Sequence, residues 1–194
     1  MGSAVARRLA DGINVTDVEK LREEGLIGYV PQNTLIFPWL SVAENVRLPF
    51  RIHNRQPDEA RVDDLIDALS IRGFLDSGPT MLSGGMAVRV ATARALVLSP
   101  QLLLIDEAFA ALDEFLRYEV WANVMREMQR GVTIFVTHSV TDAAAFASHA
   151  VVLNGRTPSH ATTVTLRPTA PTYPPVQSDS MSENINSIRR VLHP

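Results

Sequence analysis

Short, almost unbroken apolar runs mark the strands that this sequence predicts. The runs at 102–105, 132–136 and 150–153 are rich in Val, Ile and Leu, and a shorter one, IGYV, lies at 27–30. A strand that is apolar at every position is typical of a parallel sheet buried on both faces. The pattern therefore predicts four strands of a mostly parallel sheet.

Between these runs, apolar residues recur every three or four positions, which is the period of a helix with one buried face. The spacing predicts helices over 62–69, 86–97 and 116–128, and a shorter alanine-rich helix over 141–148. Alternating strands and helices predict an α/β fold in which helices flank the sheet.

Two segments depart from this alternation. Residues from about 33 to 98 are first interrupted by proline and then helical, and we interpret them as an inserted helical subdomain. From Thr157 onward Pro, Thr and Ser dominate, so we expect 157–194 to be an extended or poorly ordered tail with a weak helical turn or two near its end. The globular part would then comprise residues 1–156.

The composition limits the possible functions. The 194 residues are 46% apolar, carry a net charge of −3 and include no cysteine. The charge gives no basic field for nucleic acid, and the lack of cysteine rules out disulfides, zinc–thiolate sites and a cysteine nucleophile. No apolar run approaches the roughly 18 residues of a membrane span. We therefore expect a cytoplasmic chain that meets a membrane only through a partner.

The stretch LLLIDEAFAALD holds the first candidate chemistry, because Asp106 and Glu107 end a strand. In open α/β sheets, ligands bind beyond the carboxyl ends of the strands. There one carboxylate can reach Mg²⁺, usually through water, and its neighbour can polarise an attacking water. The pair suits metal-assisted phosphoryl transfer. The simpler alternative, in which Asp106 caps the next turn and Glu107 is merely exposed, stays open from this segment alone.

A second candidate precedes it in LSGGM, where Ser83 can cap a helix that begins at Gly84. Gly84 and Gly85 would let an anion approach bare backbone N–H groups, and a helix N-terminus with free amides is a phosphate site. On its own such a segment is often only a loop before a helix.

Together these motifs resemble the ATP-binding subunit of ABC transporters. LSGGM resembles the family's signature motif, LLLIDE its Walker B strand, AALD its D-loop, VTHS its switch histidine segment and GYVPQ its Q-loop. The five motifs occur in the family's order over roughly residues 9–155. The resemblance implies a P-loop NTPase-like fold with ATP and Mg²⁺ as cofactors.

The resemblance also assigns roles to single residues. It implies catalytic roles for Glu107 and His138, nucleotide contact by Ser83, Gly84, Gly85, Met86 and Asp113, and positions near the metal for Asp106 and Gln32. Taken singly, three of these have simpler interpretations: a histidine after a strand is commonly structural, Asp113 can cap the next helix, and an isolated glutamine means little.

One family motif, the Walker A loop GxxxxGK[ST], has no counterpart here. Lys20 is the only lysine of the chain, and it lies in the acidic context DVEKLREEG with no preceding glycine. The sequence therefore predicts that the first strands and the P-loop are missing, and that the chain is inactive alone. Two hypotheses remain: a truncated ATPase, or a degenerate subunit that supplies its signature motif in trans.

The segment NTLIFPWLSVAENVRLPF resembles importers of the nitrate, sulfonate and taurine class. The resemblance implies a second nucleotide-binding subunit and a membrane-spanning permease as partners, with Phe37 and Trp39 facing the permease from the inner side of the membrane. Ordinary packing of Trp39 inside the helical subdomain is the alternative.

Two other classes of function fit the sequence less well. A non-transport ABC ATPase of DNA repair or translation would carry long heptad insertions or two cassettes, and neither occurs in this sequence. An interaction module without a nucleotide role would explain the missing Walker A loop but would not explain Glu107 and His138.

Overall fold

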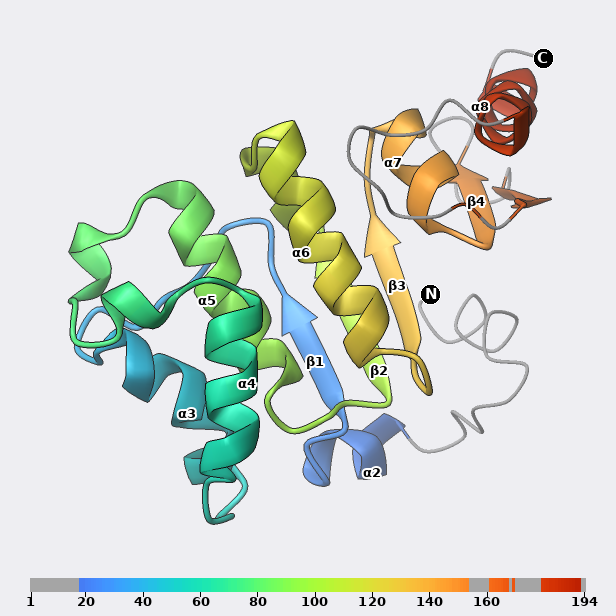
Figure 1. The fold of residues 1–194 in the computed structure, drawn as a ribbon. Helices are drawn as coiled ribbons and strands as arrows, with labels where there is room; N and C mark the ends of the chain where they lie inside the picture. Colours follow the sequence, from blue (N-terminus) through green and yellow to red (C-terminus); the bar gives the residue numbers. More distant parts are fainter. Residues whose placement is uncertain (1–17, 154–160, 168, 170–178, 193–194) are drawn as a thin grey trace. The chain divides into compact units, whose positions relative to one another are not determined.

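The computed structural model describes residues 18–153, 161–167, 169 and 179–192. The chain divides after Val136 into two compact units, which are described separately (Figure 1). Among the described residues, no helix is long and apolar enough to cross a membrane.

The first unit is built on a three-stranded parallel sheet. Its strands are β1 (Ile27–Val30), β2 (Leu102–Asp106) and β3 (Val132–Val136), hydrogen-bonded in that order. Ile27, Leu102 and Val132 lie opposite one another, so the three strands run in register toward one carboxyl edge. The predicted α/β fold with a parallel sheet flanked by helices is confirmed, but the fourth predicted strand, 150–153, does not join this sheet and pairs antiparallel with 161–165 instead.

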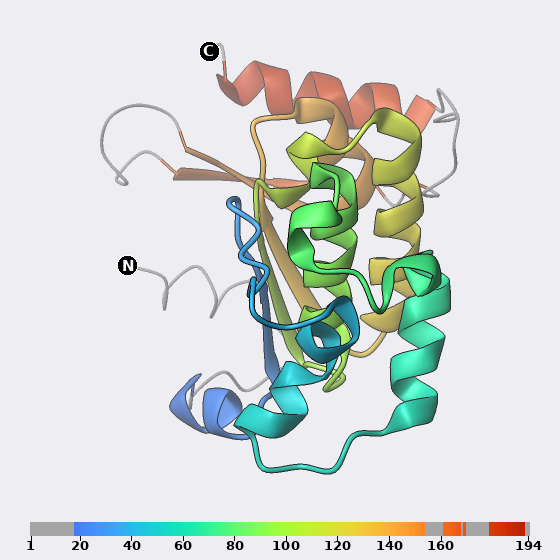
Figure 2. The same cartoon turned by 90° about the vertical axis from the view of Figure 1, so that its left-hand side faces the viewer.

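Helices α5 (Gly84–Leu96) and α6 (Glu114–Glu127) cover one face of this sheet. Figure 2 shows these two helices and the helices of the subdomain on the same side of the strands. Helix α5 approaches β1 so closely that a Cβ on Gly28 would lie 2.4 Å from the carbonyl oxygen of Ala95. On α6, the Trp121 ring meets Phe135 of β3 edge-on, with ring centres 4.6 Å apart.

The opposite face of the sheet is also apolar but remains partly open. It carries every second residue of each strand, and Tyr29 and Val136 there are 50% and 55% exposed. Asp106 is the polar residue at its carboxyl end. The expectation of strands buried on both faces thus holds within the first unit for one face only.

A group of short helices lies between β1 and α5 in the sequence. After helix α2 (Val18–Glu23) and β1 come the elements of this group: α3 (Val42–Ile52), α4 (Glu59–Ala68) and the 3-10 turns η1 (Arg72–Phe74) and η2 (Pro79–Met81). A capping box begins α3, in which the Ser41 hydroxyl accepts the Glu44 N–H and the Glu44 carboxylate accepts the Ser41 N–H. The predicted helical subdomain covers these elements and α5, and its boundaries stay a prediction.

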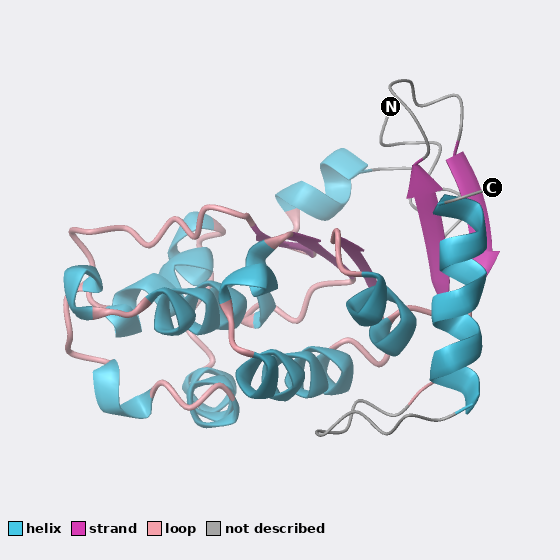
Figure 3. Cartoon of the chain, turned by 90° about the horizontal axis from the view of Figure 1, so that it is seen from above, coloured by secondary structure: helices cyan, strands magenta, loops and turns pink. Residues whose placement is uncertain are grey.

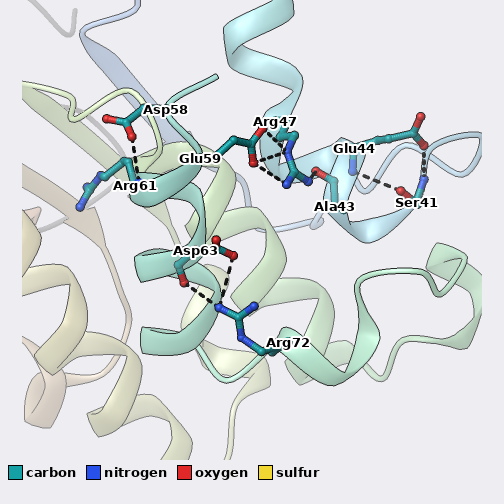
Figure 4. Close-up of polar contacts among 9 residues, drawn as sticks. All are labelled: Ser41, Ala43, Glu44, Arg47, Asp58, Glu59, Arg61, Asp63 and Arg72. Carbon is teal, nitrogen blue, oxygen red and sulfur yellow. Dashed lines mark hydrogen bonds and ion pairs between the residues drawn. The ribbon is translucent and has the colours of Figure 1, made fainter. Parts of the chain in front are cut away.

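Arginine–carboxylate pairs tie these helices together (Figure 4). Arg47 of α3 binds Glu59 of α4 through two nitrogens, and its Nη2 lies 2.7 Å from Glu59 Oε2. Arg72 of η1 bonds to Asp67 and lies 3.3 Å from Asp63, both on α4. Two-pronged pairs of this kind fix orientation as well as distance.

The second unit comprises α7 (Val140–Phe146), the antiparallel strands β4 (His149–Leu153) and β5 (Ala161–Thr165), and α8 (Asp179–Leu192). Figure 3 shows the strand pair with α8 alongside it. Its small core is formed by Ala144, Val152, Leu166 and Ile188.

These elements correct two expectations. The segment predicted as a poorly ordered tail contains β5 and α8, and the chain divides after Val136 rather than after residue 156. The sequence did not predict the full helix α8 because one of its buried positions is the polar residue Asn184, which is 3% exposed. The apolar residues alone therefore do not show a helical period there. The Asn184 amide accepts the Arg167 N–H at 2.8 Å and donates to the Ala144 carbonyl at 3.0 Å, so a polar residue serves as a core residue. Residues 157–160, 168, 170–178 and 193–194 of the predicted tail lie outside the described part of the chain.

Candidate functional site

The carboxyl end of β2 places the two candidate carboxylates in succession. Asp106 is the last residue of the strand, and both Asp106 and Glu107 are half-buried. Glu107 adopts a left-handed conformation with φ of 48°, and its N–H donates to the Val136 carbonyl at 3.0 Å. For a residue other than glycine, this backbone conformation costs on the order of 1 kcal/mol, and backbone strain of this kind clusters at functional sites. The turn breaks the alternation of the strand immediately after Asp106.

Gln32 is brought to Glu107 from the end of β1. Its Nε2 donates to Glu107 Oε2 at 3.2 Å, across 75 residues of sequence. This contact makes Glu107 more than an exposed residue after a strand, which was the simpler interpretation. It also places Gln32 beside the candidate base, and its predicted position near a metal stays a prediction.

The N-terminus of α5 has the geometry that the sequence predicts. Ser83 is the N-cap, and its hydroxyl accepts the N–H of Met86 at 3.3 Å. Ser83 and Gly84 are exposed, and a Cβ on Gly84 would meet nothing within 4 Å. The first amides of a helix lack partners within it, so this end can bind an anion.

Met86 differs from the other members of this group. Its N–H is the group that the Ser83 hydroxyl already binds, and its side chain is half-buried. Its predicted nucleotide contact therefore has to come from a group other than this amide, or through a different arrangement of Ser83.

Asp113 lies close to the same helix end through its neighbour. A Cβ on Gly85 would lie 3.4 Å from Leu112 Cδ2, so the second glycine of the signature segment packs against the residue before Asp113. Asp113 is exposed, and its Oδ1 accepts the Leu116 N–H at 3.0 Å, which caps α6. The capping role is confirmed, and a role toward nucleotide stays a prediction.

His138 belongs to the second unit, so its role in the site stays a prediction. It is exposed and lies between β3 and α7 in the sequence. Its neighbours form a local turn in which Thr137 Oγ1 accepts the Ser139 N–H at 3.0 Å, and the Ser139 hydroxyl caps α7.

In the described part of the chain, side chains alone do not form a metal site. Within the described residues, no group of three or more His, Asp or Glu side chains could hold a metal ion. Asp106 is a single half-buried carboxylate at the carboxyl edge of the sheet. This donor fits Mg²⁺, which keeps several waters and commonly takes one or two carboxylates together with substrate phosphates.

The segment after Gln32 exposes large apolar side chains. Trp39 is 74% and Leu35 is 67% exposed, and the Phe37 and Trp39 rings lie 5.4 Å apart. The alternative in which Trp39 packs inside the subdomain is therefore wrong. Sequence reasoning missed Asn45 and Arg94, which hold this segment in place; no sequence motif marks them, because they bind mainly backbone groups of the segment and each other.

Comparison with known proteins agrees with this arrangement. The family model described as ABC transporter matches residues 6–110, which is more than half of the chain. The sulfate/thiosulfate import ATP-binding protein CysA of Synechococcus elongatus is 39% identical over 132 residues, which cover 66% of this chain and 38% of that protein. The aliphatic sulfonates import ATP-binding protein SsuB of Bacillus anthracis is 34% identical over 151 residues, which cover 76% and 57%.

A solved structure shows the same relationship in three dimensions. A dimeric ATP-binding cassette in a post-hydrolysis state, bound to ADP and phosphate, superposes with a TM-score of 0.61 at 29% identity, covering 73% of this chain and 66% of that one. The chain belongs to the ABC transporter family. It spans only 38% to 57% of the length of the two relatives above.

Proposed function

We propose that this chain acts as the ATP-binding subunit of an ABC-type importer and contributes its signature segment to a nucleotide held by a second subunit. The observation that carries the proposal is the first unit's carboxyl edge, where Gln32 bonds to Glu107 at the end of β2. The exposed, capped N-terminus of α5 accompanies it. The resemblance of these segments to the Q-loop, Walker B and signature motifs supports a role for both features in phosphoryl chemistry.

The residues would divide the work as follows. Asp106 would hold Mg²⁺, which when bound neutralises charge on the phosphate oxygens. Glu107 would accept a proton from the attacking water, and Gln32 would hold the Glu107 carboxylate in place through its amide. His138 would contact the terminal phosphate as a further donor.

Ser83, Gly84 and Gly85 would instead serve the second subunit. The Ser83 hydroxyl and the first amides of α5 face outward, where a phosphate of that subunit's ATP can reach them. Buried hydrogen bonds to a charged group contribute about 1.5–3 kcal/mol each. The dimeric form of the solved relative supports this arrangement.

This division of labour follows from what the 194 residues contain. No GxxxxGK[ST] segment occurs, and the single lysine, Lys20, lies on the short helix α2. The amides and lysine that wrap the phosphates in a Walker A loop are therefore not supplied by these residues. The site formed by Asp106 and Glu107 needs a phosphate cradle from elsewhere, whereas the signature segment does not.

The transported molecule would be a small anion such as nitrate, a sulfonate or taurine. The names of the relatives, which concern sulfate, thiosulfate and aliphatic sulfonates, support an oxyanion. The exposed Trp39 and Leu35 would contact a membrane-spanning permease, placing the chain at the cytoplasmic face of the membrane.

The test is the ATPase activity of a mixed dimer with a complete nucleotide-binding subunit. Ser83→Arg should abolish any stimulation by this chain, because it places bulk and charge where the phosphate binds. Glu107→Gln should leave stimulation nearly intact, because Glu107 serves the other site. Equal effects of the two substitutions, or failure of the two chains to associate, would refute the role in trans.

A further inference from the structure

The segment from Asn33 to Ser41, called here the connecting loop, joins Gln32 to helix α3. Asn45 of α3 is fully buried beneath it. The Asn45 Oδ1 accepts the Phe37 N–H at 2.9 Å and a hydrogen of Arg94 Nη1 at 3.3 Å. Asn45 thus links the loop to Arg94, which lies on α5, 49 residues after Asn45 in the sequence.

The amide nitrogen of Asn45, Nδ2, binds carbonyl oxygens of the loop. Asn45 Nδ2 lies 3.2 Å from the carbonyl oxygens of both Phe37 and Leu40, and 3.0 Å from that of Ser41. The two hydrogens of Nδ2 are shared among these three carbonyls, and the two lone pairs of Oδ1 accept the Phe37 and Arg94 hydrogens. The hydrogen-bonding capacity of the Asn45 amide is therefore fully used. A buried polar group satisfied in this way holds one conformation of the chain around it.

Arg94 makes three contacts, and all three concern the connecting loop or its anchor. Its Nη2 donates to the Leu35 carbonyl at 2.6 Å, its guanidinium lies 5.3 Å from the centre of the Phe37 ring, and its Nη1 reaches Asn45. Burial lowers the pKa of Arg94. In the part of the chain that the structure describes, it forms no ion pair with a carboxylate. The Leu35 carbonyl and the Phe37 ring therefore stabilise the charge of Arg94, and the same contacts hold the loop in place.

Arg94 lies on the helix whose N-terminus carries the signature segment, and the connecting loop begins next to Gln32. Gln32 in turn bonds to Glu107. One chain of contacts thus runs from α5 through Arg94 and the loop to the carboxylate. The side chains of Leu35 and Trp39, which also belong to the loop, are exposed.

We propose that Arg94 is a positioning residue that fixes the connecting loop, and with it Gln32, relative to helix α5. A displacement of the loop by a partner bound at Trp39 would then reach the signature helix through the Arg94 guanidinium. The fixed loop is a property of this chain alone, while the consequence for nucleotide chemistry rests on the function proposed above.

Hydrogen exchange on the full 194-residue chain tests the positioning role. Arg94→Met removes the donors and the charge at similar length. The variant should raise the hydrogen-exchange rate of the Phe37 and Leu40 amides roughly tenfold, because these amides are protected only while the loop keeps its hydrogen-bonded conformation. Arg94→Lys keeps the charge but cannot reach Leu35 and Asn45 at once, so it should give an intermediate rate.

Arg89→Met is the matched control. Arg89 lies on the same helix, but its Nη1 contacts the Leu69 carbonyl, at 3.5 Å, and in the described part of the chain it makes no polar contact with the loop. It should leave the loop amides unchanged. Unchanged exchange in both Arg94 variants, or equal increases in Arg94→Met and Arg89→Met, would overturn the proposal. If Arg94→Met does not fold, Arg94→Lys against Arg89→Lys decides in the same way.

The mixed-dimer ATPase separates this proposal from the proposed function. Arg94→Met should lower the stimulated kcat about fivefold and change the KM for Mg-ATP less than twofold, since it acts through the position of helix α5, whose signature segment serves the partner's ATP, and not through Gln32 and Glu107. If Ser83→Arg has no effect, the proposed function fails while the exchange result still decides the role of Arg94. If Ser83→Arg acts and Arg94→Met does not, the coupling through Arg94 fails.

Discussion

The two faces of the β1–β2–β3 sheet are similar in sequence but differ in their surroundings. On the face toward α5 and α6, Val30, Leu103 and Ile105 are at most 3% exposed. On the other face, Tyr29 and Val136 are about half exposed, although a parallel sheet is normally covered on both sides. Among residues 18–136, the side chains on the face toward α5 and α6 are thus the more deeply buried ones. The open face is where further chain or another protein would add most stability.

Consecutive residues of β2 test this difference most strongly, because Leu103 and Leu104 are the same residue type on opposite faces. Leu103 is fully buried and Leu104 is half-buried. Leu103→Ala should reduce the free energy of unfolding by about 3 kcal/mol, through lost transfer energy and a cavity. Leu104→Ala should cost about 1 kcal/mol. Urea unfolding measures both, and equal losses would show that the open face is packed like the covered one.

Close packing on the covered face predicts a second effect. Gly28→Ala would place a methyl group 2.4 Å from the Ala95 carbonyl oxygen, a backbone atom that cannot rotate away. We expect α5 to shift and the free energy of unfolding to fall by about 1–3 kcal/mol. Gly73→Ala is the control, since a Cβ there meets nothing within 4 Å. Thermal unfolding of the two variants at the same temperature would contradict the close approach of α5.

The smallest predicted effect is a pH dependence of the free energy of unfolding. It arises from ion pairs of the helical subdomain and not from the sheet. The hydrogen bond from Arg47 lowers the pKa of Glu59, and that from Arg72 lowers the pKa of Asp67. A lowered folded-state pKa gives stability that is complete above the ordinary carboxyl pKa, about 4 to 4.5, and is lost as pH falls through the folded value. The stabilisation should therefore be constant at neutral pH and decline below about 4.5.

The combined variant Glu59→Gln and Asp67→Asn measures this contribution. Its difference from the unmodified chain should be largest above pH 5 and shrink toward pH 3, as followed by urea unfolding at each pH. Both carboxylates are exposed, so the difference should be small and should weaken with added salt. A difference that grows as the pH falls would have the wrong sign for these pairs.

The sheet could be predicted from the sequence because LLLID and VTIFV are apolar at nearly every position, and few other structures explain such runs. The Ser83 cap and the Asp113 cap could be predicted because capping depends on residues three positions apart. Both features are local. The resemblance to ABC transporters assigned Gln32 a position near the metal, whereas its hydrogen bond to Glu107 is seen only in the structure.

The errors arose where a polar residue occupies a buried position. Asn184 in α8 and Asn45 in α3 are both buried and satisfied by backbone groups, from distant segments for Asn184 and from the loop just before α3 for Asn45, so neither matches an apolar helical period. The Arg94 contacts were missed for the same reason. Trp39 was left between two alternatives because aromatic residues occur both in cores and in binding surfaces, and only the fold shows that it is exposed.

Calorimetric titration of the 194-residue chain with Mg-ATP tests the central claim most directly. That claim is that the chain presents a signature segment and catalytic side chains without a phosphate cradle of its own. We predict no measurable heat of binding, or binding weaker than about 1 mM, because no glycine-rich loop with a lysine lies among these residues. Binding in the micromolar range, abolished by Asp106→Asn, would contradict the account and show that the chain holds nucleotide by itself.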